Sequence, residues 1–120
     1  MSAKSYRELI AWQCAMDMVV AVYEVSRFFP KDEMYGLVNQ LRRAAVSVPS
    51  NLAEGQGRGA GRDFAQFVRI ARGSVQEVET QLLIAERLGL VTSDQTKDAL
   101  GIADEVSRLI GGLYRSLTEQ

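Results

Sequence analysis

The sequence contains no histidine and only one cysteine, Cys14. Histidine is the commonest general base near neutral pH and the commonest metal ligand, so its absence removes the usual basis for acid–base catalysis and for a metal centre. A single cysteine cannot form an internal disulfide, which is typical of proteins in a reducing compartment. We therefore expect a cytoplasmic protein that is not an enzyme and that binds no metal or cofactor.

Long hydrophobic runs are also missing. No stretch of 18 or more apolar residues occurs, which argues against a membrane-spanning helix. The first residues lack the apolar block and the cleavage site of a signal peptide. The formal net charge is −1, so the chain as a whole is not a polyanion binder. The length predicts a single domain over residues 1–120, and no small-molecule substrate is expected.

The sequence does contain apolar residues at helical spacing, interrupted by proline and glycine. This pattern predicts helices over Tyr6–Phe28, Asp32–Gly55 and Arg62–Leu88, and a last helix from Thr92 or Ser93 to Thr118. No alternating strand pattern of useful length is present. Short connections make neighbouring helices antiparallel. The predicted fold is therefore all-α, an antiparallel up-down-up-down four-helix bundle.

Glycines alternate between the second and third predicted helices, at Gly55, Gly57, Gly59 and Gly61. A string of this kind suggests a nucleotide-binding loop, but that fingerprint follows a β-strand within a βαβ unit. Here the glycines follow a helix. We interpret them as a helix C-terminus and a tight reversal of the chain.

The first predicted helix is apolar around almost its whole circumference. We assign its core stripe to Leu9, Trp12, Met16, Val19, Tyr23 and Ser26. A second apolar set lies opposite that stripe, and apolar residues of the second and third helices also point away from their core stripes. One bundle cannot bury both sides of a helix. The sequence therefore predicts a homo-oligomer whose interface includes Met18, Val22, Val46, Leu83 and Ile84.

Residues 39–72 contain six arginines against two acids, Glu54 and Asp63. Antiparallel pairing about Gly59 puts Arg42 level with Glu77, and Arg43 level with Gln76. Two interpretations follow. The first is a structural ion-pair network between the helices. In such a network arginines would lower the pKa of a carboxyl group, which makes it a poor general base. The predicted members are Arg42, Arg43, Arg72, Glu77 and Glu79.

The second interpretation is a local anion-binding patch near the glycine turn. Arg58 and Arg62 flank the glycines at the expected start of the third helix, where free backbone N–H groups favour anions. Arg69 lies two helical turns further along the same helix. These arginines, Arg58, Arg62 and Arg69, are the predicted anion or nucleic-acid contacts.

Three long motifs carry a family resemblance. They read FP-x-x-E-x-x-GL from Phe29, Q-x-RRA-x-x-S-x-P-x-N-x-AEG from Gln40, and ARGS-x-x-E-x-E-x-Q-L from Ala71. Through them the chain resembles the four helix bundle proteins, also called 23S rRNA-intervening-sequence proteins. The resemblance extends from about Tyr6 to Gly89. Within the motifs it covers Phe29, Pro30, Glu33, Gly36, Leu37, Gln40, Arg42, Arg43, Ala44, Ser47, Pro49, Asn51, Ala53, Glu54, Gly55, Ala71, Arg72, Gly73, Ser74, Glu77, Glu79, Gln81 and Leu82.

The resemblance implies a small cytosolic bacterial protein that assembles as a ring of five bundles, a homopentamer. A related branch is an accessory subunit of the reverse transcriptase of diversity-generating retroelements, and it is strongly basic where this chain is nearly neutral. We therefore expect a non-enzymatic homo-oligomeric assembly or adaptor protein, linked to RNA or to a reverse-transcription complex. The alternative is a protein that binds RNA or DNA directly through the arginine-rich patch of the second and third helices.

Overall fold

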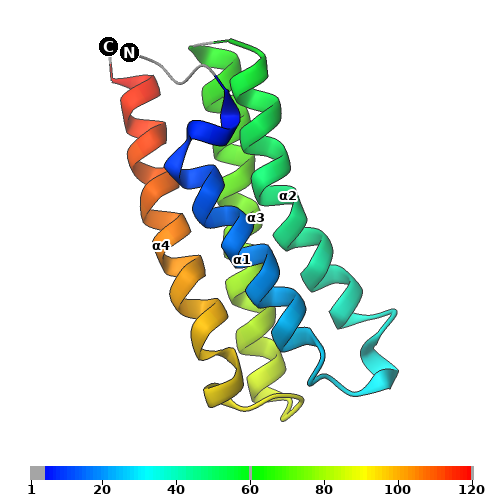
Figure 1. Cartoon of the computed structure of the whole chain (residues 1–120). Coiled ribbons are helices and arrows are strands. Elements are labelled where there is room, and N and C mark those ends of the chain that lie inside the picture. Colours follow the sequence, from blue (N-terminus) through cyan, green and yellow to red (C-terminus); the bar gives the residue numbers. More distant parts are fainter. Residues whose placement is uncertain (1–4, 60, 120) are drawn as a thin grey trace.

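The computed structural model describes residues 5–59 and 61–119. Four long helices run alternately up and down: α1 (Ile10–Ser26), α2 (Leu37–Gly57), α3 (Arg62–Arg87) and α4 (Ser93–Thr118). Each packs against its neighbours in chain order, and α4 also packs against α1 (Figure 1). No strand occurs in this described part. The predicted all-α, antiparallel, up-down-up-down four-helix bundle is confirmed.

The expected domain also includes residues 1–4, 60 and 120, which lie outside the described residues. Within the described ranges, no helix is both long and apolar enough to cross a lipid bilayer. The bundle measures 45 × 22 × 19 Å along its principal axes. The first and the last described residues lie at the same end of the bundle, because an even number of antiparallel helices returns the chain to the end where it began (Figure 1).

The chain enters the bundle through a short 3-10 helix, η1 (Tyr6–Glu8), rather than directly through α1. The Ser5 hydroxyl accepts from the Arg7 N–H at 3.2 Å, and the Glu8 carboxylate accepts from the Ser5 N–H at 3.3 Å. This capping box therefore caps η1. Leu9 is extended, so α1 begins at Ile10, and the predicted start at Tyr6 was too early.

A second 3-10 helix, η2 (Lys31–Glu33), precedes α2, so the predicted start of that helix at Asp32 was also too early. Gly36 has an irregular backbone conformation and α2 begins at Leu37. The Glu33 carboxylate accepts from the Leu37 N–H at 3.3 Å. Glu33 lies outside α2, and its carboxylate supplies a hydrogen-bond acceptor to one of the N–H groups at the start of the helix that have no partner within it.

The turn between α2 and α3 uses its glycines for two different reasons. Gly59 and Gly61 have positive φ angles of 101° and 80°, which favour glycine and allow the tight reversal. Gly55 is instead a buried residue of α2. A Cβ atom there would lie 2.7 Å from the Cβ of Phe67 and 3.1 Å from a ring carbon of Phe64. The close approach of α2 to α3 therefore depends on the missing side chain at Gly55.

The link between α3 and α4 is fixed at both ends. Gly89 has a positive φ of 74° after the last turn of α3. Thr92 and Gln95 form the capping box of α4, which confirms Thr92 as the cap. The fully buried Thr96 donates its hydroxyl hydrogen to the Glu86 carboxylate at 2.5 Å. This bond ties the end of α3 to the start of α4.

The core stripe predicted for α1 was wrong except at Ser26, which is buried. Met16 and Tyr23 are 42% and 38% exposed, whereas Met18 and Val22 are fully buried. Met16 and Met18 have the same side chain, so the face that α1 turns toward α2 and α4, and not side-chain size, decides which residues are buried. The buried residues of α1 are Ala11, Ala15, Met18, Ala21, Val22, Val25 and Ser26.

This correction removes two of the five residues predicted for an oligomer interface. Met18 and Val22 pack in the core of their own bundle and present no surface to a partner. Val46, Leu83 and Ile84 are 41%, 49% and 42% exposed, so they do lie outside the core. The outer apolar residues of α1 are Ile10, Met16, Val20 and Tyr23.

Gly55→Ala is predicted to destabilise the bundle. The new methyl group would meet Phe67 at 2.7 Å, and overpacking of this kind costs about 1–3 kcal/mol. Gly57→Ala is the matched control on the same helix, because no atom lies within 4 Å of its Cβ position. Urea unfolding of both variants would measure the difference. Equal stability of the two variants would show that α2 and α3 are not in close contact at Gly55.

Candidate functional site

Arg42 connects α1 to α2, and not α2 to α3 as predicted. Its Nε donates to the Ser26 hydroxyl at 2.9 Å, and its guanidinium carbon lies 4.5 Å from the centre of the Tyr23 ring. The Ser26 hydroxyl in turn donates to the Tyr23 carbonyl at 2.8 Å. A cation over an aromatic face is attracted by the ring electrons. Arg42 is therefore structural, but with partners other than Glu77.

The register of α2 against α3 is set by a hydrogen bond between the hydroxyl groups of Ser47 and Ser74, at 2.9 Å. Asn51 supports it by donating to the Ser47 hydroxyl at 2.9 Å and to the Ser47 carbonyl at 2.8 Å. With Ser47 opposite Ser74, Arg43 is level with Val78 rather than with Gln76, and it lines the same hollow as Glu77. The predicted pairing of the two helices was therefore shifted.

A polar hollow of about 330 Å³, which this serine pair helps to line, lies between α2 and α3. Arg43 and Glu77 both line it, yet they form no ion pair in the described part of the chain. The Oε1 atom of Gln81 is buried and has no hydrogen-bond partner. We call this feature the α2–α3 hollow; its lining residues are Gln40, Arg43, Ala44, Ser47, Ser74, Glu77 and Gln81.

Glu79 and Arg72, the other members of the predicted network, lie apart from the α2–α3 hollow. Burial raises the pKa of Glu79, and the nearby charge of Asp104 on α4 raises it further. The prediction that arginines lower the pKa of this carboxyl group was wrong. Arg72 is exposed and makes no ion pair among the described residues. The predicted five-residue ion-pair network is therefore not formed.

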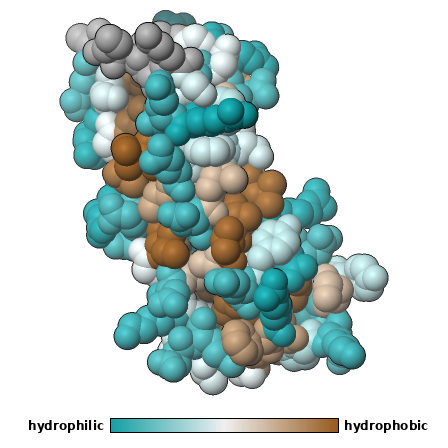
Figure 2. All heavy atoms as spheres, viewed as in Figure 1, coloured by the Kyte–Doolittle hydropathy of each residue, from teal (hydrophilic) through white to brown (hydrophobic). Residues whose placement is uncertain are grey.

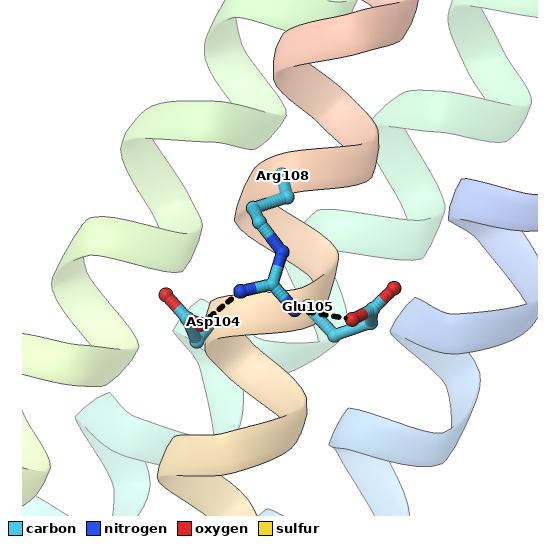
Figure 3. A network of polar contacts seen from close by, with 3 residues as sticks. All are labelled: Asp104, Glu105 and Arg108. Carbon is cyan, nitrogen blue, oxygen red and sulfur yellow. Dashed lines mark hydrogen bonds and ion pairs between the residues drawn. The ribbon is translucent and has the colours of Figure 1, made fainter.

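The ion pairs of the described residues lie on single helices. Arg108 pairs with Asp104 at 2.6 Å and with Glu105 at 2.5 Å, all on α4 (Figure 3). Arg58 pairs with Glu54 at 3.1 Å on α2. All of these side chains are about half exposed or more. Exposed pairs of this kind contribute little to stability, so they do not lock one helix against another.

The predicted anion patch is divided in the structure. Arg58 is held by Glu54 and lies 5.1 Å from the centre of the Phe67 ring. Arg62 and Arg69 line a different hollow of about 450 Å³ between α3 and α4. Arg69 also donates to the Gln66 side-chain oxygen at 2.9 Å. The remaining candidates for an anion contact are therefore Arg62 and Arg69, without Arg58.

A groove of about 730 Å³ runs between α1 and α4. Its lining includes small or apolar residues, among them Cys14, Val20, Ala21, Gly101 and Ile102. Figure 2 shows hydrophobic side chains gathered over the middle of the face that carries α1. We call this feature the α1–α4 groove; its charged lining residues are Asp17, Glu24, Asp98, Glu105 and Lys97.

The α1–α4 groove was not predicted from the sequence, because the core of α1 was assigned to the wrong side of the helix. One signal was available: α1 has two acids and no base, so an acidic surface could have been predicted. Burial raises the pKa of the Cys14 thiol, and the charges of Glu105 and Asp17 raise it further. A thiol in this state is a weak nucleophile. In the described residues, no group of three or more acidic or cysteine side chains could hold a metal ion.

Comparison with known proteins places the fold and the motifs in one family. The family model described as "23S rRNA-intervening sequence protein" matches residues 7–112. A solved structure of a protein with unknown function from the S23 ribosomal protein family of Bacteroides thetaiotaomicron is similar, with a TM-score of 0.81 and 18% identity. The match covers 88% of this chain and 99% of that chain. No curated protein matches.

Arg42→Ala is predicted to destabilise the bundle more than Arg43→Ala. The first change removes a hydrogen bond to a buried serine and the contact with Tyr23, together about 1–2 kcal/mol. Arg43 is exposed and has no partner in the described structure, so its loss should change stability by about 0.5 kcal/mol or less. Thermal unfolding of the two variants is the measurement. A larger effect at Arg43 would contradict this assignment.

Glu79→Gln is predicted to gain stability over the wild type as pH rises. A carboxyl group whose pKa is higher in the folded than in the unfolded chain binds more protons when folded, so its ionisation disfavours the folded state. The glutamine variant cannot ionise. Its advantage should therefore widen as pH rises above the ordinary glutamate value of 4.5. Urea unfolding across this pH range tests the prediction, and a pH-independent difference would refute it.

Proposed function

The chain belongs to the 23S rRNA-intervening sequence protein family, and within it we propose a non-enzymatic homo-oligomeric ring with an assembly or adaptor role. The observation that carries this proposal is a pair of unlike surfaces on one bundle. One is the acidic α1–α4 groove. The other is an apolar patch that carries an arginine, at the end of α3. Two unlike surfaces of one chain can bind each other between neighbouring copies.

The α3 patch consists of exposed apolar side chains next to a cation. Leu83, Ile84 and Leu88 are 49%, 42% and 66% exposed. Arg87, beside them, is exposed at the end of α3. Apolar residues gathered in this way are typical of an interaction surface. We call this surface the α3 patch; it consists of Leu83, Ile84, Arg87 and Leu88.

The α1–α4 groove matches the α3 patch in chemistry and in height along the bundle. The groove offers apolar side chains and four carboxylates, of which Glu105 is paired with Arg108, against one lysine. The three other carboxylates and the apolar side chains complement Arg87 and its apolar neighbours. The end of α3 leads directly into the start of α4, where Lys97, Asp98 and Gly101 line the groove. Both surfaces therefore lie in the same half of the bundle, as a ring with its axis parallel to the helices requires.

A contact between unlike surfaces repeats from copy to copy, and it closes into a ring when the rotation between neighbours permits. The number of copies that we propose, five, comes from the resemblance to the family. Val46 is exposed on α2, away from the end of α3, and is not needed for this contact. The adaptor role follows from the same features, since an assembled ring presents each outer surface several times.

The geometry favours assembly over direct binding of RNA or DNA. Arg58 is neutralised by Glu54, Arg42 is held on Tyr23 and Ser26, and Arg43 shares its hollow with Glu77. Binding to a phosphate backbone depends on several free cations close together. Arg62 and Arg69 line one hollow, and Arg42 and Arg43 line another, so neither of these two hollows has more than two arginines. A reverse-transcriptase or RNA partner would therefore meet the assembled ring rather than one arginine-rich patch.

Two variants on opposite surfaces should test the ring contact. Light scattering of the wild type should give a mass several times 13.3 kDa. Val20→Arg puts a cation in the α1–α4 groove, and Leu83→Asp puts an acid in the α3 patch. Each change gives the surface the same charge as the surface that it should bind, so the two surfaces repel each other and each variant alone should be monomeric. Tyr35→Asp is the control, because Tyr35 is 94% exposed away from both surfaces.

Mixing the two variants separates a contact between unlike surfaces from a symmetric one. Val20→Arg keeps an intact α3 patch, and Leu83→Asp keeps an intact α1–α4 groove. One intact contact remains between them, so the mixture should form a 1:1 pair and no ring. A monomeric wild type would refute the oligomer. Variants that stay monomeric when mixed would refute the contact between the two named surfaces.

A further inference from the structure

The α2–α3 hollow is lined by side chains from two helices: Gln40, Arg43, Ala44 and Ser47 of α2, and Ser74, Glu77 and Gln81 of α3. The hydrogen bond between Ser47 and Ser74 joins the two helices at the hollow. Arg43 lies about one turn before Ser47 and Glu77 about one turn after Ser74, and Gln40 and Gln81 lie about one turn further from the serine pair. Arg43 also lines a second hollow, between α1 and α2. The α2–α3 hollow, of about 330 Å³, is at the lower limit of the volumes that hold small ligands.

The base of the α2–α3 hollow has hydrogen-bonding capacity that the described protein does not use. The Oε1 atom of Gln81 is buried and accepts no hydrogen bond. The hydroxyl of Ser47 accepts from Asn51 and shares one hydrogen bond with Ser74. Two hydroxyl groups that share one bond retain a second O–H hydrogen. A buried acceptor that lacks a donor is costly, which favours an occupant with N–H or O–H groups.

The rim of the α2–α3 hollow has two opposite charges that do not neutralise each other. The guanidinium of Arg43 comes from α2 and the carboxylate of Glu77 comes from α3. Neither belongs to an ion pair among the described residues. Opposite charges that face one hollow without meeting can each bind a separate charged group of one ligand.

These features exclude most simple ligands. Glu77 and the Gln81 oxygen would repel an inorganic anion, while Arg43 would repel a metal ion or a simple amine. No aromatic side chain lines the hollow to stack on a nucleobase. A molecule with one carboxylate and one ammonium group satisfies both ends. We propose that the α2–α3 hollow binds a small zwitterion, namely a free α-amino acid.

In this arrangement the carboxylate of the amino acid accepts hydrogen bonds from Arg43 and from the Gln40 amide. The ammonium group donates to the Glu77 carboxylate and to the buried Gln81 oxygen, which supplies the missing donor. The hollow does not coincide with the surfaces of the proposed ring. None of the residues of the α3 patch lines the hollow. Leu83 points away from Gln81, whereas Ile84 and Leu88 lie on the same flank of α3 as Glu77 and Gln81, about two turns further along. The hollow therefore borders the α3 patch without including any of its residues.

The test is isothermal titration of the full chain with three probes that differ only in charge. L-Alanine has both charges, N-acetyl-L-alanine has only the carboxylate, and L-alanine amide has only the ammonium group. The proposal expects saturable binding of L-alanine and binding at least about tenfold weaker for the two analogues, because each loses a charge-assisted hydrogen bond. Equal binding of either analogue, or no saturable binding of L-alanine, would refute it.

Two variants and a control place the binding in the hollow. Arg43→Gln and Glu77→Gln change exposed side chains without partners, so both variants should fold, which circular dichroism would check. Each should weaken L-alanine binding about tenfold or more. Arg72→Gln is the matched control, since Arg72 is an exposed arginine of α3 that does not line the hollow. Loss of binding in the control, or unchanged binding in both test variants, would refute the site.

Discussion

The fit of α2 against α3 is the constraint on which the other features of this bundle depend. It is held at one point by the absence of a side chain, at Gly55, and at another by the hydrogen bond between Ser47 and Ser74. Apolar packing alone specifies which face of a helix is buried, but it permits small shifts along the axis. A hydroxyl pair at the edge of an apolar core adds a directional bond that such shifts would break. The register in turn decides which polar residues face one another, and it thereby creates the α2–α3 hollow.

Much of the fold was predictable from the sequence because it depends on local patterns. The apolar stripes of α2, α3 and α4 have helical spacing and a polar opposite face, so the buried residues followed directly. The start of α4 was also predictable to within one residue, as Thr92 or Ser93, because a capping side chain and its backbone partner lie within three residues of each other. For α1 the pattern had two apolar faces. The interior of the bundle selected the face with Ala11, Ala15 and Met18, and no local rule gave more weight to these small residues than to Trp12 and Tyr23.

The candidate sites were less predictable because they depend on small shifts and on side-chain reach. The expected register differed from the observed one by two residues, and Arg43 forms no ion pair among the described residues. Arg42 is next to it in sequence but lies on the other flank of α2, where it reaches Ser26 and Tyr23. The numbers of arginines and acids in the sequence give the net charge, but they do not show which arginine forms an ion pair with which acid. The α2–α3 hollow is also lined by uncharged residues of the motifs, among them Ser47, Ser74 and Gln81.

The close contact at Gly55 also has a kinetic consequence. Gly55 and Phe67 are only 12 positions apart, and the turn between them contains Gly59 and Gly61, whose positive φ angles suit a tight reversal. Contacts of short sequence separation require little loop-closure entropy and form early in folding. We therefore expect the α2–α3 hairpin to form first and to provide the surface on which α1 and α4 dock. The motif residues of α2 and α3 would then direct the folding pathway as well as the final structure.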